Sequence, residues 1–192
     1  MNSARRLAVL FALQALALAF MIADRQWILA SGTPVVLETE PVDPRSLFSG
    51  DYVRLRYTVN RVTLPADGET QTLARHDAIY VVLQQGAPYW RPVSVHATLP
   101  TVAPGQAVIR GEVLHVGERG WDRTGMRAVE GRYAEVRYGI ESYFVPENEG
   151  RSIERPAAGE TVSIRAAVDA RGRAAIQALL VNGKEKYIER LF

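Results

Sequence analysis

Residues 41–57 of the chain read PVDPRSLFSGDYVRLRY, and the interpretation of the whole sequence starts from this stretch. Two prolines stiffen its first half, and Gly50 followed by Asp51 is typical of a tight turn. From Val53 onward every second residue is apolar, which is the period of a β-strand with one buried face. The stretch therefore predicts a turn that leads into a strand.

The predicted strand covers residues 52–62 as one continuous element with two different faces. The face expected to contact the core carries Val53, Leu55, Tyr57 and Val59. The face expected to meet solvent carries Tyr52, Arg54, Arg56 and Thr58. Because side chains alternate along a strand, this division leaves the second set available for binding.

The composition fits one domain of ordinary size and excludes several kinds of site. The chain has 192 residues, of which 47% are hydrophobic, enough for one core. It contains no cysteine, so disulfides, thiolate metal sites and cysteine nucleophiles are excluded. The formal charge of +2 comes from interspersed arginines and acids, which argues against nucleic acid as a partner. Lys184 and Lys186 are the only lysines among 23 basic residues, a bias that points to a GC-rich bacterial genome.

An apolar segment near the N-terminus predicts a membrane anchor. Residues 7–23 read LAVLFALQALALAFMIA, preceded by Arg5 and Arg6 and followed by Asp24 and Arg25. As a helix the segment extends roughly 25 Å at ~1.5 Å per residue, against a hydrocarbon core of about 30 Å. We therefore expect these residues to cross the bacterial inner membrane as a single pass.

The charges around the anchor predict its orientation. The arginines before the apolar segment place the N-terminus in the cytoplasm by the positive-inside rule. Residues 1–30 then form the N-terminus and anchor, and residues 31–192 form an extracytoplasmic, periplasmic β domain after a linker at 31–34. The alternative is a cleaved signal peptide, but its site near residue 30 would have a large apolar residue at the −3 position. An uncleaved anchor is favoured.

The remainder of the chain reads as short strands separated by turns. Strands are predicted at 35–40, 52–62, 79–83, 89–97, 107–116, 161–168 and 174–181, and the long segment 126–145 is expected to split near Gly131 or Gly139. Pro92 assigns its strand to a sheet edge, and Asp169 to Arg173 is the clearest hairpin turn. A short helix is expected at 70–77 and a polar loop at 117–124. About eight strands predict an all-β domain, either a sandwich or a partly open barrel.

Two blocks of the sequence resemble a known family. The first is Gly50-Asp51-Tyr52 with Leu55 and Tyr57 behind it, preceded by Asp43-Pro44-Arg45. The second is the segment from Tyr138 to Glu147. Together they resemble the GDYXXLXY family of bacterial membrane-anchored proteins, and the resemblance covers the N-terminal anchor and essentially the whole extracytoplasmic part. It implies a single-pass anchored domain, often encoded beside polytopic membrane proteins, and it names no activity.

The first block also resembles the nucleophile motif of signal peptidase I, in which a serine and a proline precede Gly-Asp-x-Val. Matching the two motifs needs a one-residue insertion and places Pro41 at the position of the catalytic serine. Proline cannot act as a nucleophile, and both lysines lie in a polar segment that does not suit a desolvated lysine base. A serine–lysine peptidase is therefore not predicted.

The residues of the two blocks divide into a structural set and a binding set. The set expected to lock the turn onto the strand is Asp43, Pro44, Gly50, Leu55 and Tyr57. The set expected to contact a ligand or partner is Arg45, Asp51, Tyr52, Arg54, Arg56, Glu141 and Tyr143. Because Glu141 would share a face with Tyr143, we expect its carboxylate to need a cation such as Arg137 or Arg54.

Two function classes remain, and neither implies a cofactor. The first is a non-catalytic accessory module that binds a polytopic membrane protein or another envelope component. Its binding face is expected to display Tyr52, Arg54, Arg56 and the block from Tyr138 to Pro146. The alternative is an envelope hydrolase or transferase that uses the carboxylates of Asp51 and Glu141 or Glu147. The 3 histidines have no spacing typical of a zinc site, so no metal is predicted.

Overall fold

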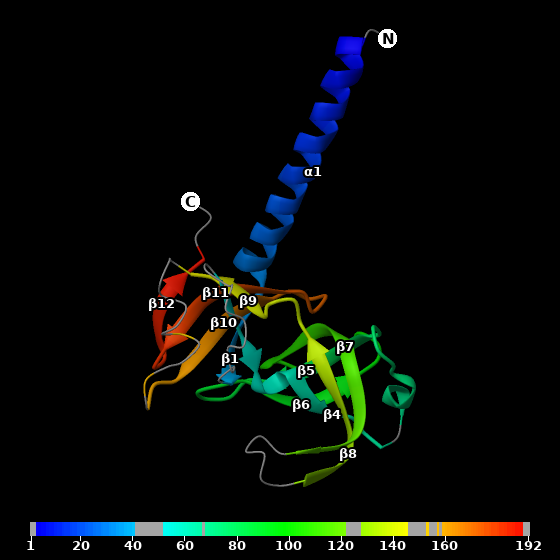
Figure 1. Cartoon of the computed structure of the whole chain (residues 1–192), viewed down its shortest axis with the longest axis vertical. Helices are drawn as coiled ribbons and strands as arrows, with labels where there is room; N and C mark the ends of the chain where they lie inside the picture. The colour runs from blue at the N-terminus through cyan, green and yellow to red at the C-terminus, as the bar shows by residue number, and fades with distance from the viewer. Residues whose placement is uncertain are drawn as a thin grey trace.

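The structure, a computed structural model, describes residues 3–40, 52–66, 68–121, 128–145, 153, 157 and 159–189, with the backbone alone for 52, 119–121 and 128–130. Within these residues one long helix precedes a domain made of strands (Figure 1). The predicted all-β fold with one N-terminal helix is confirmed. The predictions for Asp43, Pro44, Arg45, Gly50, Asp51 and Glu147 lie outside the described residues.

The described elements have the following bounds. The helix α1 is Ser3–Ser31. The strands are β1 Thr33–Glu40, β2 Tyr52–Arg54, β3 Arg56–Tyr57, β4 Arg61–Thr63, β5 Ala78–Gln84, β6 Arg91–His96, β7 Gln106–Trp121, β8 Ala128–Arg137, β9 Ser142–Phe144, β10 Val162–Val168, β11 Ala174–Val181 and β12 Lys184–Ile188. Two 3-10 turns, η1 Thr58–Asn60 and η2 Glu69–Thr72, lie before β4 and before β5.

Within the described residues, the strands form two five-stranded sheets and a two-stranded ribbon. One sheet has the order β12-β11-β10-β1-β3, and the other has the order β4-β8-β7-β5-β6. The ribbon consists of β2 and β9. A single apolar cluster takes members from both sheets and from the ribbon, among them the fully buried Leu37, Val53 and Ile109. The three sheets therefore share one core.

The prediction of one continuous strand at 52–62 is wrong, although its buried face is confirmed. The segment forms β2, β3, η1 and β4 in succession. Asn60 Oδ1 accepts the backbone N–H of Tyr57 at 2.5 Å, which closes the turn η1. Val53, Tyr57 and Val59 nevertheless are no more than 1% exposed. The breaks allow β2, β3 and β4 to pair with three different strands, β9, β1 and β8.

Other segments agree with the predicted pattern only in part. The hairpin at Asp169 to Arg173 joins β10 and β11, and β6 lies at a sheet edge, as predicted. The loop predicted at 117–124 is wrong, because β7 continues to Trp121 by pairing with β8. The helix predicted at 70–77 is only the four-residue turn η2. Strand β12 was not expected, since its sequence KEKYI is mostly charged and suits an exposed sheet edge.

The helix α1 continues beyond the apolar segment and ends against the first sheet. Only Gly32 separates its last residue from β1, so the linker predicted at 31–34 is wrong. Ile28 is 5% exposed and packs against Ala167 of β10 and Ala175 of β11. The end of the helix is therefore part of the packed domain.

Polar contacts fix the same helix end to the β10–β11 hairpin. Arg173 Nη1 lies 2.7 Å from Asp24 Oδ2, and its Nε lies 2.8 Å from Asp169 Oδ2. Burial opposes the ionisation of Asp169, but the hydrogen bonds from Arg173 and Arg171 and the charge of Arg173 together lower the pKa of that carboxyl. Gln177 Nε2 also donates a hydrogen bond of 2.8 Å to the Leu29 carbonyl. These bonds determine the direction in which the helix leaves the domain.

A side chain at position 32 is expected to loosen this junction. A Cβ on Gly32 would lie 2.6 Å from the Ile28 carbonyl oxygen and 2.8 Å from the Val168 nitrogen. Since both are backbone atoms, Gly32→Ala should lower the free energy of unfolding by about 1–3 kcal/mol, measured by thermal unfolding in detergent. Ala30→Ser, on the exposed side of the helix end, is the control and should change it by less than about 0.5 kcal/mol. Equal stability of the two variants would contradict tight packing at the junction.

Candidate functional site

The two sequence blocks meet in space as the ribbon of β2 and β9. Strand β2 runs antiparallel to β9, so that Val53 lies opposite Tyr143. The Leu55 N–H then donates a hydrogen bond of 2.8 Å to the Glu141 carbonyl. Consecutive backbone pairs therefore join the first block to the second.

Two buried tyrosines reinforce this joint from opposite sides. The Tyr57 hydroxyl, in the first block, donates to the Ile140 carbonyl. The Tyr138 hydroxyl, in the second block, donates to the Val59 carbonyl at 2.6 Å. Burial raises the pKa of both phenols well above the ordinary value, and the nearby charge of Glu141 adds to the effect. Both hydroxyls therefore stay protonated, and we call their two hydrogen bonds the tyrosine clasp.

Glu141 lies in the turn between β8 and β9, where N–H donors occupy its carboxylate. Oε1 accepts the Tyr138 N–H at 2.6 Å and the side-chain amide of Asn60 at 3.2 Å. Oε2 accepts the Gly139 N–H at 2.8 Å. A carboxylate that accepts backbone N–H groups two and three residues away is typical of a side chain that stabilises a turn.

The ion pair predicted for Glu141 is wrong. Arg137 Nη2 lies 2.7 Å from Glu112 Oε2 instead. Arg54 is exposed on β2, outside the contacts of that carboxylate. Because N–H groups already satisfy both oxygens of Glu141, no cation is needed to compensate for its partial burial.

The exposed side of the ribbon and of the neighbouring strand β3 carries cations. Arg54 of β2 and Arg56 of β3 are exposed, and Phe144 of β9 is 77% exposed. Tyr143, predicted to contact a ligand, is 6% exposed and belongs to the core, where burial raises its pKa. Among the predicted binding residues, Arg54 and Arg56 are therefore accessible to a partner, whereas Tyr143 is not. We call Arg54, Arg56 and Phe144 the ribbon face.

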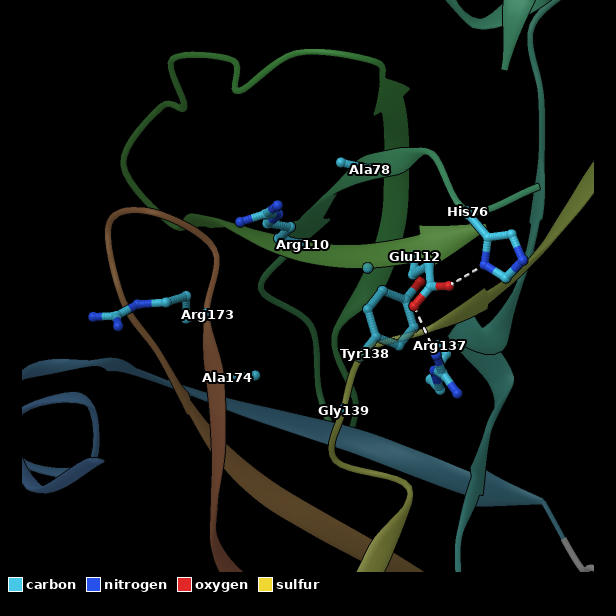
Figure 2. A pocket seen from close by; sticks show the side chains of 10 residues that line it. His76, Ala78, Arg110, Glu112, Arg137, Tyr138, Gly139, Arg173 and Ala174 are labelled. Atoms are coloured by element: carbon cyan, nitrogen blue, oxygen red, sulfur yellow. Dashed lines mark hydrogen bonds and ion pairs between the residues drawn. The ribbon is translucent and has the colours of Figure 1, made fainter. Parts of the chain in front are cut away.

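A second candidate is a groove of about 420 Å³ between β7, β8 and the β10–β11 hairpin (Figure 2). The nitrogen-bearing side chains that line it are His76, Arg110, Arg137 and Arg173. At one end, Glu112 Oε1 lies 2.6 Å from His76 Nδ1 and Oε2 lies 2.7 Å from Arg137 Nη2. The hydrogen bonds with His76 and Arg137 lower the pKa of Glu112, so the groove contains a fixed ionised carboxylate.

This cluster could not be predicted from sequence spacing, because its members come from different elements. Glu112 of β7 lies directly opposite Arg137 of β8 in the sheet register. His76 is placed by its own N–H, which donates to the Val113 carbonyl at 2.8 Å. Opposite charges on paired strands are a recognisable signal, but only once the register of the strands is known.

A third cluster links a serine, a histidine and a glutamate as a catalytic triad does, but it does not line a hollow that could hold a substrate. Ser94 Oγ lies 3.0 Å from His96 Nε2, and His96 Nδ1 lies 3.2 Å from Glu69 Oε1. Ser94 and Glu69 are exposed, on edge strand β6 and turn η2, and none of the three lines either described hollow. A serine nucleophile needs a substrate hollow and oxyanion donors beside it. Among the described residues there is also no group of three side chains suited to a metal ion.

Comparison with known proteins places the chain in a family. A family model, GDYXXLXY protein, matches residues 14–179, from within α1 through both blocks to β11. The chain belongs to the GDYXXLXY family. No curated protein and no solved structure gave a significant match.

The last two positions of the GDYXXLXY motif have a physical explanation in this structure. Leu55 is buried in the common core, and its N–H binds the second block. Tyr57 supplies one half of the tyrosine clasp. The first positions, Gly50 and Asp51, lie outside the described residues. Within its described part, the GDYXXLXY motif therefore marks a joint between distant segments of the chain.

Removing the charge of Glu141 tests its role in the turn. Glu141→Gln replaces one acceptor oxygen by an NH2 group among N–H donors, so we expect the free energy of unfolding to fall by about 1–3 kcal/mol in chemical denaturation. Glu135→Gln is the matched control, because Glu135 makes a partly exposed pair with Arg61 at 3.2 Å. That change should cost no more than about 1 kcal/mol. Equal losses in both variants would contradict a specific role for Glu141.

Proposed function

We propose that the protein is a non-catalytic accessory module of the bacterial cell envelope, anchored in the inner membrane by α1 with its β domain in the periplasm. The observation that carries this proposal is the ribbon face, an exposed surface built on the joint between the two family blocks. Its expected partner is a polytopic membrane protein with acidic residues on its periplasmic side.

The membrane placement is supported by α1. It is the one helix among the described residues that is long and apolar enough to cross a membrane, and its apolar window is not buried in the domain. Phe20 is 71% exposed, and an exposed phenylalanine is more stable in lipid than in water. Trp27, also exposed, suits the membrane interface beyond Asp24. The orientation rests on Arg5 and Arg6, which favour a cytoplasmic N-terminus.

The rigid junction between helix and domain supports a partner in the same membrane. Because only Gly32 separates α1 from β1, the domain holds a defined orientation relative to the helix. Two proteins that share a membrane have already lost much of the translational and rotational freedom that binding would cost. A modest contact surface is then sufficient for association.

The chemistry of the ribbon face suits a protein partner. Arginine and aromatic side chains are enriched at the residues that contribute most to protein–protein binding. Arg54 can form two parallel hydrogen bonds with a carboxylate of the partner. Phe144, which lies opposite Tyr52 in the ribbon, offers exposed apolar area. Arg56 lies 3.7 Å from Glu40 Oε2, a partly exposed pair that a partner's carboxylate could replace.

The alternative function, an envelope hydrolase or transferase, has less support. Of its proposed carboxylates Asp51, Glu141 and Glu147, only Glu141 is among the described residues. A general acid or base needs an oxygen directed at the substrate. Both oxygens of Glu141 instead accept N–H groups of the protein. The accessory role is therefore the function that we propose.

Reporter fusions after Phe192 test the proposed orientation. Because the N-terminal arginines should stay in the cytoplasm, alkaline phosphatase fused there should be active, and green fluorescent protein fused there should stay dark. The same two reporters fused before Arg5 are the control and should give the reverse result. Fluorescence without phosphatase activity after Phe192 would contradict a periplasmic domain.

Charge reversal on the ribbon face tests the proposed interface. Arg54→Glu combined with Arg56→Glu should lower the recovery of the membrane partner at least about fivefold, because repulsion replaces the attraction of a central contact. Recovery is measured by cross-linking in native membranes, purification and quantitative mass spectrometry.

The matched control for this experiment is Arg91→Glu, which reverses an exposed arginine at the start of edge strand β6. Its recovery of the partner should equal that of the unchanged protein. Thermal unfolding of both variants checks that the domain is intact. Unchanged recovery with the double variant would exclude the ribbon face as the interface.

A further inference from the structure

The groove of Figure 2 is a basic site separate from the ribbon face. Its lining brings together four nitrogen-bearing side chains against the single carboxylate of Glu112. Small residues, among them Ala78, Gly111 and Ala174, line it between these groups. With a volume of about 420 Å³, the groove can admit a ligand of modest size.

Two of the three arginines already have acidic partners. Arg137 contacts Glu112 at 2.7 Å. Arg173 contacts Asp24 at 2.7 Å and Asp169 at 2.8 Å. These two guanidinium groups therefore contribute little uncompensated charge, and the attraction for an incoming anion depends on the third.

Arg110 is that third arginine, and its guanidinium has no partner among the described residues. Its backbone is held in place, since its N–H donates to the Gly172 carbonyl at 2.8 Å. A Cβ on Gly172 would lie 2.9 Å from the Arg110 nitrogen, so the close approach of hairpin and strand depends on that glycine. An exposed, uncompensated cation thus stands on a fixed backbone at the groove.

His76 adds an independent observation at the other end. Its backbone has a φ of 74°, a left-handed conformation that residues other than glycine rarely adopt. The N–H bond to Val113 and the 2.6 Å contact of Nδ1 with Glu112 hold it there. Strained backbone that the surroundings keep in place is often found at ligand sites. The Nε2 of His76, on the other side of the ring from this contact, has no partner among the described residues.

The groove adjoins the end of the membrane anchor. Arg25 Nη1 donates a hydrogen bond of 3.3 Å to the carbonyl of Ala174, which lines the groove. Arg173, also in the lining, contacts Asp24. Asp24 and Arg25 directly follow the apolar segment of α1. If that segment spans the bilayer, this wall of the groove lies at the level of the lipid headgroups.

We propose that the groove binds a phosphate group, with Arg110 as its main contact, and that the phosphate belongs to an anionic phospholipid of the surrounding membrane. A guanidinium group is suited to phosphate because it offers parallel N–H donors in a planar fork. The outer N–H groups of Arg137 provide further donors at the other end of the groove. The lipid source rests on the proposed membrane anchor, whereas the phosphate chemistry does not.

Lipid selection by the full-length protein tests this proposal. The protein is placed in nanodiscs with equal amounts of phosphatidylglycerol and phosphatidylcholine, extracted with mild detergent, and its retained lipids are quantified by mass spectrometry. The unchanged protein should retain phosphatidylglycerol preferentially. In Arg110→Gln the ratio of the two lipids should fall about fivefold, the effect expected for one arginine near a membrane surface.

Two further variants show whether the effect belongs to the groove. Arg110→Lys keeps the charge and should retain part of the preference, because lysine contacts phosphate as a point charge. Arg91→Gln removes an exposed arginine from β6, outside the groove, and should leave the ratio unchanged. An equal fall in Arg91→Gln and Arg110→Gln would overturn the proposal in favour of general electrostatic attraction.

A second measurement identifies the source of the phosphate. Binding of glycerol 3-phosphate to the protein in a neutral detergent is followed by titration calorimetry, with Arg110→Gln as the comparison. Preferential phosphatidylglycerol retention that depends on Arg110 supports the lipid. Binding of glycerol 3-phosphate without lipid preference supports the phosphate site and overturns the lipid source. No preference and no binding would overturn the site, and neither result depends on the reporter fusions or the partner recovery.

Discussion

The tyrosine clasp is the constraint on which the arrangement of the sheets depends. Tyr57 binds the Ile140 carbonyl in the second block, and Tyr138 binds the Val59 carbonyl just after the first block, so two distant segments hold each other. Both rings are buried in the common core, where a carbonyl without a donor would cost about 1–3 kcal/mol. The turn containing Glu141 presents Tyr138 at the correct position, because its carboxylate accepts the Tyr138 N–H. Packing, hydrogen bonding and turn geometry therefore stabilise the same joint.

The orientation of the helix relative to the domain is also fixed. An anchored domain on a flexible linker could turn any of its faces toward the membrane. Here the helix ends one residue before β1, and Asp24 and Arg25 bind the β10–β11 hairpin. The groove beside Arg110 then adjoins the helix end, while the ribbon face is a separate exposed surface. A lipid contact in the groove would add to the constraint on the domain, and the ribbon face would be left open for a protein partner.

Much of the strand pattern could be predicted, because alternation reports burial whatever the partner strand is. Val53, Tyr57 and Val59 are buried as their spacing predicts. The continuity of residues 52–62 could not be predicted, since the break depends on one side chain, Asn60, binding back to Tyr57. The length of β7 was underestimated because Gly117 to Trp121 has the composition of a loop, and only pairing with β8 makes it a strand. Local propensity is overruled wherever a partner strand supplies the hydrogen bonds.

By itself the sequence determined the apolar helix, the all-β class and the membership of the GDYXXLXY family, because each depends on local composition, periodicity or motif. Only the tertiary structure decided which charges meet. Glu141 accepts N–H groups where an arginine was expected, and Arg137 lies opposite Glu112 because the register of β7 and β8 places it there. The physical reason is that ion pairs and hydrogen bonds act over a few ångströms. Partners at that distance are set by strand register and turn geometry, which are properties of the folded chain.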